Sequence, residues 1–561
     1  MGSLQNDNVI IETDIFIAGS GPVGCTFARV ILDSTNDLDT RVFMVDIGSL
    51  DSSVIGEHQK NDLRYQRDGN FFGMQLCFGP ESALTIDDLY AGHVIDAALQ
   101  PVSITDNDVP FSPYYNPKQD PSKNLPNCAI TRAVGGMGTH WTCACPEPEE
   151  EERQNSPIKN ELPEWLGRAK DLLKVRDDQY DNEIRHILVK LWLEKSREFE
   201  GRVRNLPLAV ERSKEQQEVV TFAGPNTILG DWAKPGNFCT NSDCEKHCRF
   251  SLRSDHRVST IVRYQKDYPD ESKRGQVSYV AVWDLRSGKI LSVKAKKYVI
   301  ALGAICTPQV LWDSGFSDGS DFFGGPDLPA IGRYLSEQSL VTCQVVLKED
   351  LREKIKENLW QYMVPNSEPQ VNVKFTREKP WNGMINHDAY LYGSHKPGFK
   401  YDQRFIVDLR FYGRSEVSRE NRLMFKEEGP DVLNNTPGVT FDVTRSDNDK
   451  YWDSLMEEDM RDAAKELGEI IEGSEPVWQP FGAALHVTGT TRMGHDNETK
   501  TSVVNEFSKV HGQSDLYIGG NGVIPDATAC NPTLTSVGYA IKAAEHIVKQ
   551  LRQDAGGSDA N

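Results

Sequence analysis

The hydrophobic positions near the N-terminus change from a strand pattern to a helix pattern. Residues 13–18, TDIFIA, form a short apolar run that is typical of a buried strand. A glycine-rich turn, GSGPVG, follows at 19–24, and residues 25–33 continue with helical spacing. A second β-like run at 41–45 ends at Asp46. The order strand, glycine turn, helix, strand and acid predicts a dinucleotide-binding unit.

Each polar or small residue of this unit has a physical role in the prediction. Gly19 permits the tight turn, Gly21 lets the backbone approach a pyrophosphate, and Gly24 lets the helix pack closely on the strand. The helix N-terminus stabilises the phosphate charge. Asp46 is placed to accept hydrogen bonds from a ribose diol.

The chain becomes rich in β-like runs from Val258 onward. The run YVIALG at 298–303 predicts a buried strand that ends in glycine, followed by a helix with Pro308 near its first turn. This strand and helix would complete the cofactor-binding sheet. Residues 340–480 mix strand and loop patterns and predict a second sheet over the first.

Helical periodicity marks two further segments. Residues 161–199 are predicted to be helical, with a cap at Asp181 or Asn182. The predicted core face of this segment comprises Ile184, Ile187, Leu188, Leu191 and Trp192. The last helix carries an apolar stripe of Val537, Ala540, Ile541, Ala544 and Ile547.

Two other regions are predicted to lack regular structure. Residues 50–130 are rich in Gly, Pro, Asp and aromatic residues, and we expect long loops that cover the cofactor. The charge run PEPEEEER at 146–153 is predicted to be a solvated linker or the start of an exposed arm.

The predicted order of strands and helices indicates the fold class α/β, with α+β character around the second sheet.

Composition narrows the classes of partner. The chain has 561 residues, 38% hydrophobic and 26% charged, with a formal net charge of -21. This acidity disfavours nucleic acid and anionic membranes, and favours a neutral or cationic small molecule as substrate. No apolar stretch is long enough for a membrane span, and the N-terminal segment lacks the features of a secretory signal. We expect a soluble intracellular protein.

Eleven cysteines are spread along the chain. Without a secretory signal, reduced thiols are the expectation. Cys239, Cys244, His247 and Cys248 form a cluster that could bind zinc, but the adjacent His247 and Cys248 make joint ligation awkward. We therefore predict a loop that tolerates oxidation, and no metal site.

A second glycine-rich stretch, VGGMGTHWT at 134–142, contains a histidine. Gly135 and Gly136 allow close approach to a flat or charged ligand, and Thr139 and Thr142 flank His140. Alone, the stretch fits a tight turn with a packed tryptophan. Together with the N-terminal unit, it predicts the wall of a cofactor pocket.

Two polar residues near the C-terminus suggest chemistry. His486 lies in AALHVTGTTRMG, and Asn531 lies in CNPTLT, after a further glycine pair that ends at Gly520. Each alone fits a buried polar group bonded to the backbone. As a pair they suit the oxidation of an alcohol, because an imidazole can take the hydroxyl proton near neutral pH and an amide can orient the hydroxyl without ionising.

These motifs together resemble the glucose-methanol-choline (GMC) oxidoreductase family over nearly the whole chain. The resemblance rests on GSGPVG, YVIALGAICTPQVLWDSG, LHVTGTTRMG and NPTLT. VGGMGTHWTC is similar to the segment by which sugar oxidases of this family attach their flavin, although Gly138 stands where serine is common. HDAYLYG at 387–393 is similar to their mobile substrate loop.

The resemblance implies a cofactor and a set of roles. FAD would be attached covalently through His140 to its 8α-methyl group, with Thr142 near flavin N5. His486 would be the base for hydride transfer to N5, with Asn531 as its partner. O2 would then be reduced to H2O2. The further residues assigned by the resemblance are Gly520 and Thr533 at the cofactor, and Asp388 and Tyr392 at the sugar.

The same resemblance divides the chain into two interleaved domains. Residues 1–150, 241–340 and 501–561 would form a Rossmann-like FAD-binding domain. Residues 151–240 and 341–500 would form a substrate-binding domain on the second sheet.

Several alternatives stay open. The resemblance favours oxidation of an aldopyranose such as D-glucose at C2, but relatives that oxidise C3 of sugar glycosides share most of these motifs. Further hypotheses are a polyol oxidase, a quinone-dependent sugar dehydrogenase and a nucleotide-binding scaffold without turnover. The sequence also leaves a homo-oligomer open. An NAD-dependent enzyme is disfavoured because it assigns no role to THW or to the C-terminal glycines.

Overall fold

A computed structural model provides the three-dimensional structure of the chain. It describes residues 9–50, 52–61, 119–125, 128, 130–215, 219–240, 248–316, 328–357, 370–386, 405–426 and 438–557. Asp388, Tyr392 and the loop 387–393 lie outside the described residues, as does most of 50–130.

The first sheet contains the predicted dinucleotide-binding unit. Its strands run in the order β6-β2-β1-β9-β8-β7, and β18 also pairs with β9. Strands β6, β2, β1, β9 and β18 are parallel, while β8 and β7 are antiparallel additions at one side. The strands are β1 (Val9–Ala18), β2 (Val42–Val45), β6 (Phe250–Arg253), β7 (His256–Arg263), β8 (Val277–Asp284), β9 (Ile290–Ile300) and β18 (Leu516–Ile518).

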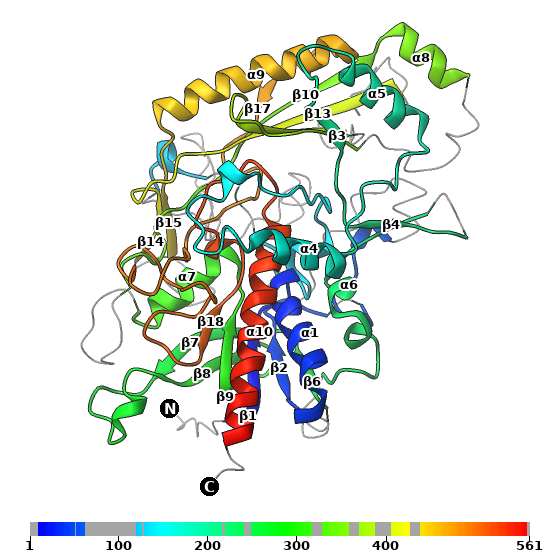
Figure 1. Cartoon of the computed structure of the whole chain (residues 1–561). Coiled ribbons are helices and arrows are strands. Elements are labelled where there is room, and N and C mark those ends of the chain that lie inside the picture. The colour runs from blue at the N-terminus through cyan, green and yellow to red at the C-terminus, as the bar shows by residue number, and fades with distance from the viewer. Residues whose placement is uncertain are drawn as a thin grey trace.

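Two long helices cover one face of this sheet. Helix α1 (Pro22–Ser34) begins with proline at its first position, where the missing N–H has no helical partner to lose. It runs beside α10 (Thr533–Gly557), so the first and last helices of the chain pack together (Figure 1). The whole predicted stripe of α10, from Val537 to Ile547, is buried, which confirms the prediction. Helix α4 (Leu162–Leu173) packs against α10.

The predicted second sheet is also present. Its order is β16-β10-β13-β12-β11-β3, with β17 paired to β10, and these pairings are antiparallel. The strands are β3 (Val203–Asn205), β10 (Ser339–Leu347), β11 (Val371–Val373), β12 (Trp381–Asn386), β13 (Ile406–Gly413), β16 (Gly468–Ile470) and β17 (Val477–Trp478). The domain boundaries themselves stay a prediction.

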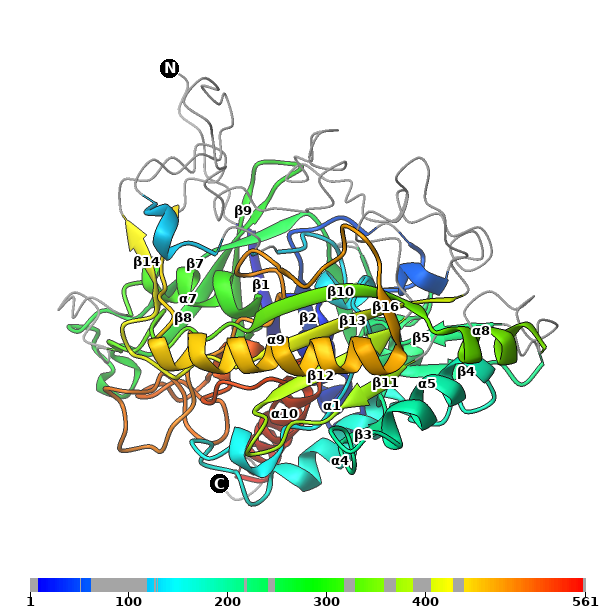
Figure 2. The same cartoon turned by 90° about the horizontal axis from the view of Figure 1, so that it is seen from above.

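Helix α9 (Asp447–Leu467) lies across the outer face of the second sheet (Figure 2). It begins with a capping box between Ser446 and Asp449, in which each side chain accepts from the other residue's backbone N–H. Helices α5 (Ile184–Glu194) and α8 (Glu349–Lys356) lie at the same end of the molecule. Their apolar side chains share one core with those of the sheet.

The remaining elements connect these layers. They are α6 (Pro225–Leu229), α7 (Gly303–Asp313), and the hairpins β4 (Val210–Arg212) with β5 (Val220–Phe222) and β14 (Arg422–Lys426) with β15 (Gly438–Asp442). Pro308 lies inside α7 and not in its first turn, so the predicted start of this helix was too late.

The segment 161–199 departs from its prediction. It forms two helices, α4 and α5, and neither predicted residue caps α5, which begins after Glu183. The predicted core face is also wrong, because Leu191 is 45% exposed while Val189 and Leu193 are buried. The apolar residues of α5 surround most of the helix, so periodicity alone does not select the face that packs on the second sheet.

The cysteine prediction needs a correction. Cys239 and Cys248 form a disulfide, so the chain does not hold only reduced thiols. The bridge joins the segment beside β6 to the residues just before that strand, and it uses two of the three sulfurs of the considered zinc cluster. Cys244 and His247 lie outside the described residues.

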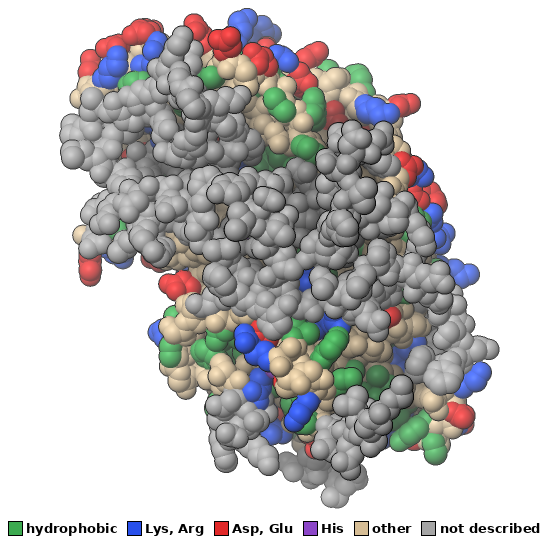
Figure 3. Space-filling view, turned by 180° about the vertical axis from the view of Figure 1, so that it is seen from behind, with side chains coloured by type: hydrophobic (Ala, Val, Ile, Leu, Met, Phe, Trp, Pro, Cys, Tyr) green, Lys and Arg blue, Asp and Glu red, His purple; other side chains and the backbone are tan. Residues whose placement is uncertain are grey.

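Acidic and basic side chains alternate along one rim of the molecule (Figure 3). From behind, acidic and basic side chains mingle along the upper rim, the end at which α8 and α9 lie (Figure 3). The acidity of the chain is therefore partly balanced locally at this rim. Among the described residues, none of the helices combines the length and the apolar character that crossing a membrane requires.

Candidate active site

The N-terminal glycine turn is held by a buried carboxylate. Asp46 Oδ2 accepts hydrogen bonds from the Ser20 backbone N–H at 2.8 Å and from Ser20 Oγ at 2.6 Å, and its Oδ1 accepts from Gly48 N at 2.8 Å. Burial raises the pKa of Asp46, and these hydrogen bonds oppose that rise. Oδ1 keeps acceptor capacity for a ribose hydroxyl. Asp46 therefore shapes the turn, in addition to its predicted role.

Glycine is required where the turn passes its neighbours. Gly19 has φ +95°, and a Cβ there would collide with the Ala301 carbonyl oxygen. A Cβ on Gly24 would collide with the Gly19 carbonyl, so this residue lies at the helix–strand contact that the motif predicts. At Gly21 the nearest atom to such a Cβ is 3.9 Å away, which leaves the backbone open toward the cavity.

The second glycine stretch is tied to the first. Ser20 Oγ accepts the Gly135 N–H at 2.8 Å, so the chain Asp46–Ser20–Gly135 joins two motifs that are far apart in sequence. Residues Gly136–Thr139 form a 3-10 helix. Inside it, Gly138 has no room for serine, because a Cβ would lie 2.7 Å from Pro22 Cγ. Packing against α1 thus explains this departure from the family pattern.

His140 follows directly and faces the cavity. Its Nε2 lies 2.8 Å from Thr131 Oγ1. Burial lowers the pKa of His140 to about 4, so its imidazole is neutral at physiological pH. A neutral ring nitrogen is nucleophilic, which a covalent bond to a cofactor requires.

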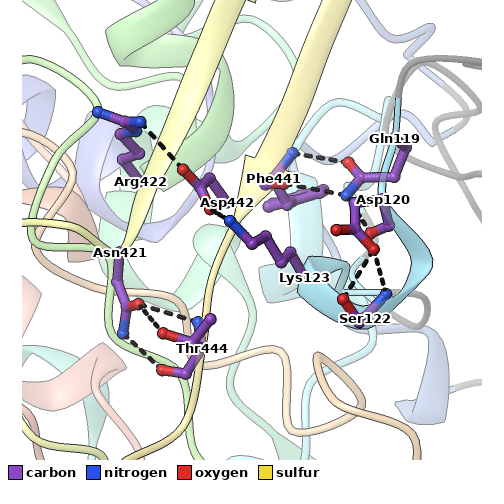
Figure 4. Close-up of polar contacts among 9 residues, drawn as sticks. All are labelled: Gln119, Asp120, Ser122, Lys123, Asn421, Arg422, Phe441, Asp442 and Thr444. Atoms are coloured by element: carbon purple, nitrogen blue, oxygen red, sulfur yellow. Dashed lines mark hydrogen bonds and ion pairs between the residues drawn. The ribbon is translucent and has the colours of Figure 1, made fainter.

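The segment before His140 is bound to the β14–β15 hairpin (Figure 4). The side-chain amide of Gln119 makes two hydrogen bonds to the backbone of Phe441, of 2.7 and 2.9 Å, as a neighbouring strand would. Lys123 forms an ion pair of 2.9 Å with Asp442, which also pairs with Arg422. These contacts hold an apolar wall beside the cavity that includes Cys128, Ile305, Val439 and Val487.

His486 is fixed by contacts to both its backbone and its ring. Its N–H donates to the two carboxyl oxygens of Glu337, at 3.0 and 3.2 Å. Its Nδ1 lies 2.7 Å from Gln338 Oε1, and Tyr412 packs beside the ring with centroids 5.6 Å apart. Leu485, just before it, has φ +59°, a strained conformation for leucine. The contacts of the following residue hold this strained backbone in place.

The ring of His486 is neutral, and its Nε2 faces Asn531. An amide oxygen can only accept, so Nδ1 carries the hydrogen and Nε2 carries the lone pair. Asn531 Nδ2 donates to that Nε2 at 3.2 Å. Burial lowers the pKa of His486 to about 3, which keeps it unprotonated. The structure thus brings the two predicted residues together.

The loop that carries Asn531 is anchored by a residue of the charge run. Glu152 is 2% exposed, and its carboxyl oxygens accept from Ala529 N at 2.6 Å and from Glu149 N at 2.9 Å. Burial raises the pKa of Glu152 to about 7. The prediction of a solvated linker was therefore wrong for this residue.

One cavity of about 440 Å³ joins these elements. The predicted site residues that line it are Gly19, Gly21, Asp46, Gly136, His140, Thr142, His486, Gly520, Asn531 and Thr533. Gly24, Gly135 and Thr139 lie behind the wall, where the first two shape the turns and Thr139 Oγ1 donates to the Gly136 carbonyl at 2.9 Å. Asp388 and Tyr392 fall outside the described residues.

The cavity fits a dinucleotide with a reactive end. Among the described residues, no side chain caps the N-terminus of α1, so its first amides are available to an anion. In the wall beside His486, the buried Oδ1 of Asn531 has no hydrogen-bond partner within the described residues. An orphaned acceptor in a cavity wall is expected to bind a donor of a ligand.

Sequence reasoning missed four residues of the site. They are Ser20, Glu152, Glu337 and Gln338, none of which makes its key contact within its own motif. Ser20 lies inside the glycine motif, which gave a positional signal. Nothing in the run SEQ at 336–338 marks the last two.

Comparisons with known proteins agree with this arrangement. A family model described as GMC oxidoreductase matches residues 437–540. The pyranose 2-oxidase of Tricholoma matsutake is 38% identical, covering 98% of this chain and 95% of that protein. A C-glycoside 3-oxidase of Microbacterium trichothecenolyticum is 29% identical, covering 97% of this chain and 98% of that protein.

A solved structure supports the fold. A formate oxidase of Aspergillus oryzae superimposes with a TM-score of 0.61 at 13% identity, covering 98% of this chain and 100% of that one. At this identity the likeness concerns the fold alone. It agrees with the predicted α/β class and with a Rossmann-like sheet joined to a second sheet.

Proposed function

This chain belongs to the GMC oxidoreductase family, and on that premise we propose that it is an FAD-dependent sugar oxidase. Its substrate would be an aldopyranose such as D-glucose. The enzyme would oxidise the ring hydroxyl on C2 and so produce a keto-sugar. The observation that carries the proposal is the neutral His486 Nε2 beside Asn531 in a cavity built from two glycine turns. The higher identity to a pyranose 2-oxidase than to a C-glycoside 3-oxidase supports C2 over C3.

The lining residues suggest how FAD would be held. The pyrophosphate would meet the backbone at Gly19 and Gly21 and the open N-terminus of α1. Asp46 would accept from the ribose through Oδ1, and His140 would form the covalent link. Thr142, Gly520 and Thr533 line the same cavity and would contact the cofactor from its other sides.

Residues of the chain would accept the proton of the substrate hydroxyl and orient that hydroxyl. Nε2 of His486 takes the hydroxyl proton while the carbinol carbon becomes a carbonyl carbon. Asn531 Nδ2, which now donates to Nε2, can turn its hydrogen bond to the substrate oxygen, and Oδ1 remains to accept from a bound donor. Bound FAD would supply the oxidant, taking the hydride with its two electrons and passing two electrons to O2, which with two protons becomes H2O2.

Product analysis tests this proposal directly. The holoenzyme is incubated with D-glucose under oxygen, and in parallel with a C-glycoside or with a quinone in place of oxygen. We expect one H2O2 per sugar oxidised and a new carbonyl at C2 by carbon NMR.

Two results would contradict the proposal at different levels. A carbonyl at C3 would contradict oxidation at C2 but would still support a sugar oxidase. No flavin reduction by any sugar would overturn the sugar oxidase itself.

A further inference from the structure

Gln338 lies behind His486, away from the two residues that sequence patterns single out. It is 3% exposed. Its Nε2 donates to the backbone carbonyls of Thr528 at 2.7 Å and of Cys530 at 2.9 Å, and its Oε1 faces Nδ1 of His486 at 2.7 Å. The two contacts to the carbonyls are buried and the contact to His486 is partly buried, and each joins Gln338 to a segment about 150 to 190 residues away.

The two carbonyls decide which way the amide points. Turning the amide over would place its oxygen against two carbonyl oxygens and its NH2 against the imidazole. Each buried polar group left without a partner costs roughly 1–3 kcal/mol. The oxygen of Gln338 therefore faces His486, and it can only accept a hydrogen bond. The hydrogen of the imidazole is consequently on Nδ1, and the lone pair is on Nε2.

The same amide relates His486 to Asn531. Thr528 and Cys530 belong to the loop whose next residue is Asn531, and Asn531 Nδ2 contacts the Nε2 that Gln338 leaves as an acceptor. One glutamine thus contacts the base through its oxygen and the loop of the base's partner through its nitrogen.

We propose that Gln338 is a positioning residue, which holds His486 as the Nδ1–H tautomer and keeps Nε2 aimed at Asn531 and the substrate hydroxyl. The proposal rests on the proposed role of His486 as base. Gln338 lines no part of the cavity, so it acts only through its neighbours. The contact of Glu337 with the His486 backbone N–H orients the chain, but it leaves the choice of tautomer to Gln338.

Two variants of equal length separate the acceptor from mere packing. Both substitutions remove the NH2 that donates to Thr528 and Cys530. Gln338→Met also removes the acceptor, whereas Gln338→Glu keeps an acceptor oxygen toward His486. We expect the methionine variant to lose the single tautomer of His486 and to lower kcat roughly 10–100-fold with little change in KM. The glutamate variant should keep the single tautomer, whereas its kcat should fall because the carbonyls of Thr528 and Cys530 lose their donor.

The tautomer is read without turnover. Nitrogen NMR of the holoenzyme labelled in histidine distinguishes the protonated from the unprotonated ring nitrogen, and the signal of His486 is assigned as the one lost in His486→Ala. Gln513→Met is the matched control, because Gln513 is also buried and donates to a backbone carbonyl, that of Gly275 at 3.0 Å, but does not line the cavity. It should keep both the tautomer and kcat.

Two results would overturn the proposal. One is a methionine variant with the wild-type nitrogen signals and wild-type kcat. The other is a glutamate variant whose histidine nitrogen signals match those of the methionine variant while the Gln513 control is normal, because the acceptor oxygen would then not set the tautomer. If no sugar reduces the wild-type flavin, the proposed function fails, and the nitrogen signals still test the role of Gln338.

Discussion

His140 and His486 are both neutral imidazoles in the wall of one cavity, yet they are held in different ways. Burial lowers the pKa of both, to about 4 for His140 and to about 3 for His486. The ring of His140 contacts the hydroxyl of Thr131, which can donate or accept. The ring of His486 lies between two amides, one facing it as acceptor and one as donor.

The difference matches two kinds of chemistry. A hydroxyl partner leaves the tautomer of His140 free to change, which suits a ring that would form a permanent bond through nitrogen. Two amides of opposite role leave His486 one tautomer, which suits a base that must present the same lone pair in every cycle. The buried environment supplies neutrality to both residues, and only their partners separate their roles.

The largest expected effect is that of His486→Ala. Without the proposed base, flavin reduction by sugar should slow roughly 10²–10⁴-fold, while the flavin stays bound to the protein. The rate is measured from flavin absorbance without oxygen. His511→Ala is the control, since His511 is buried but lies outside the cavity lining. Wild-type reduction in His486→Ala would remove this residue from the mechanism.

The second prediction concerns Glu337, which holds the backbone of His486. Burial raises its pKa from the ordinary 4.5 to about 8, so the folded protein binds more protons than the unfolded chain between these values. Its contribution to stability is complete below about pH 4.5 and is lost as the pH rises through about 8. The pKa shifts of His140 and His486 act in the opposite direction. Their contributions to the stability of the protein are lost as the pH falls below the ordinary pKa of 6.5.

The effect of Glu337 is therefore isolated from the histidines above about pH 6.5. Between there and about pH 8, the apparent free energy of unfolding of the wild type should fall by roughly 2 kcal/mol relative to Glu337→Gln. Chemical denaturation at both ends of this window measures the difference. Parallel curves for the two proteins would show that Glu337 does not titrate there.

The smallest effect is expected for His140→Ala. Flavin should then stay in solution when the protein is precipitated with acid, whereas wild-type flavin should precipitate with the chain. Sugar oxidation should persist at a rate lowered about tenfold, equivalent to ~1.4 kcal/mol, because the proposed link would raise the oxidising power of the cofactor. Wild-type flavin that remains in the supernatant would show that His140 carries no covalent bond.

Much of the first sheet was predictable because its signals are local. The run 13–18, the glycine turn and the second strand lie within one short segment. They form β1, α1 and β2 in the predicted order, although β1 begins four residues and α1 three residues earlier than predicted. The stripe of α10 was also correct, but residues 534–544 of this helix are buried on nearly all sides, so its burial did not depend on selecting one face. The face of α5 was wrong, because apolar residues lie on several of its sides.

Within the candidate site, sequence patterns indicated only residues that lie inside unusual motifs. His140, His486 and Asn531 stand among glycines, threonines and prolines that mark close packing around a ligand. Gln338 and Glu152 stand in ordinary polar runs, and their importance depends on partners about 150 and 380 residues away. Pairing across such distances leaves no periodic trace along the chain.

The sequence by itself determined the dinucleotide-binding unit, the presence of a second sheet and the residue types that could oxidise an alcohol. Only the tertiary structure decided which nitrogen of His486 faces Asn531, and that Glu152 is buried beneath the loop of Asn531. The physical reason is that propensity and periodicity act between near neighbours. The direction of a hydrogen bond and the cost of burying a charge depend on atoms that folding brings together from remote segments.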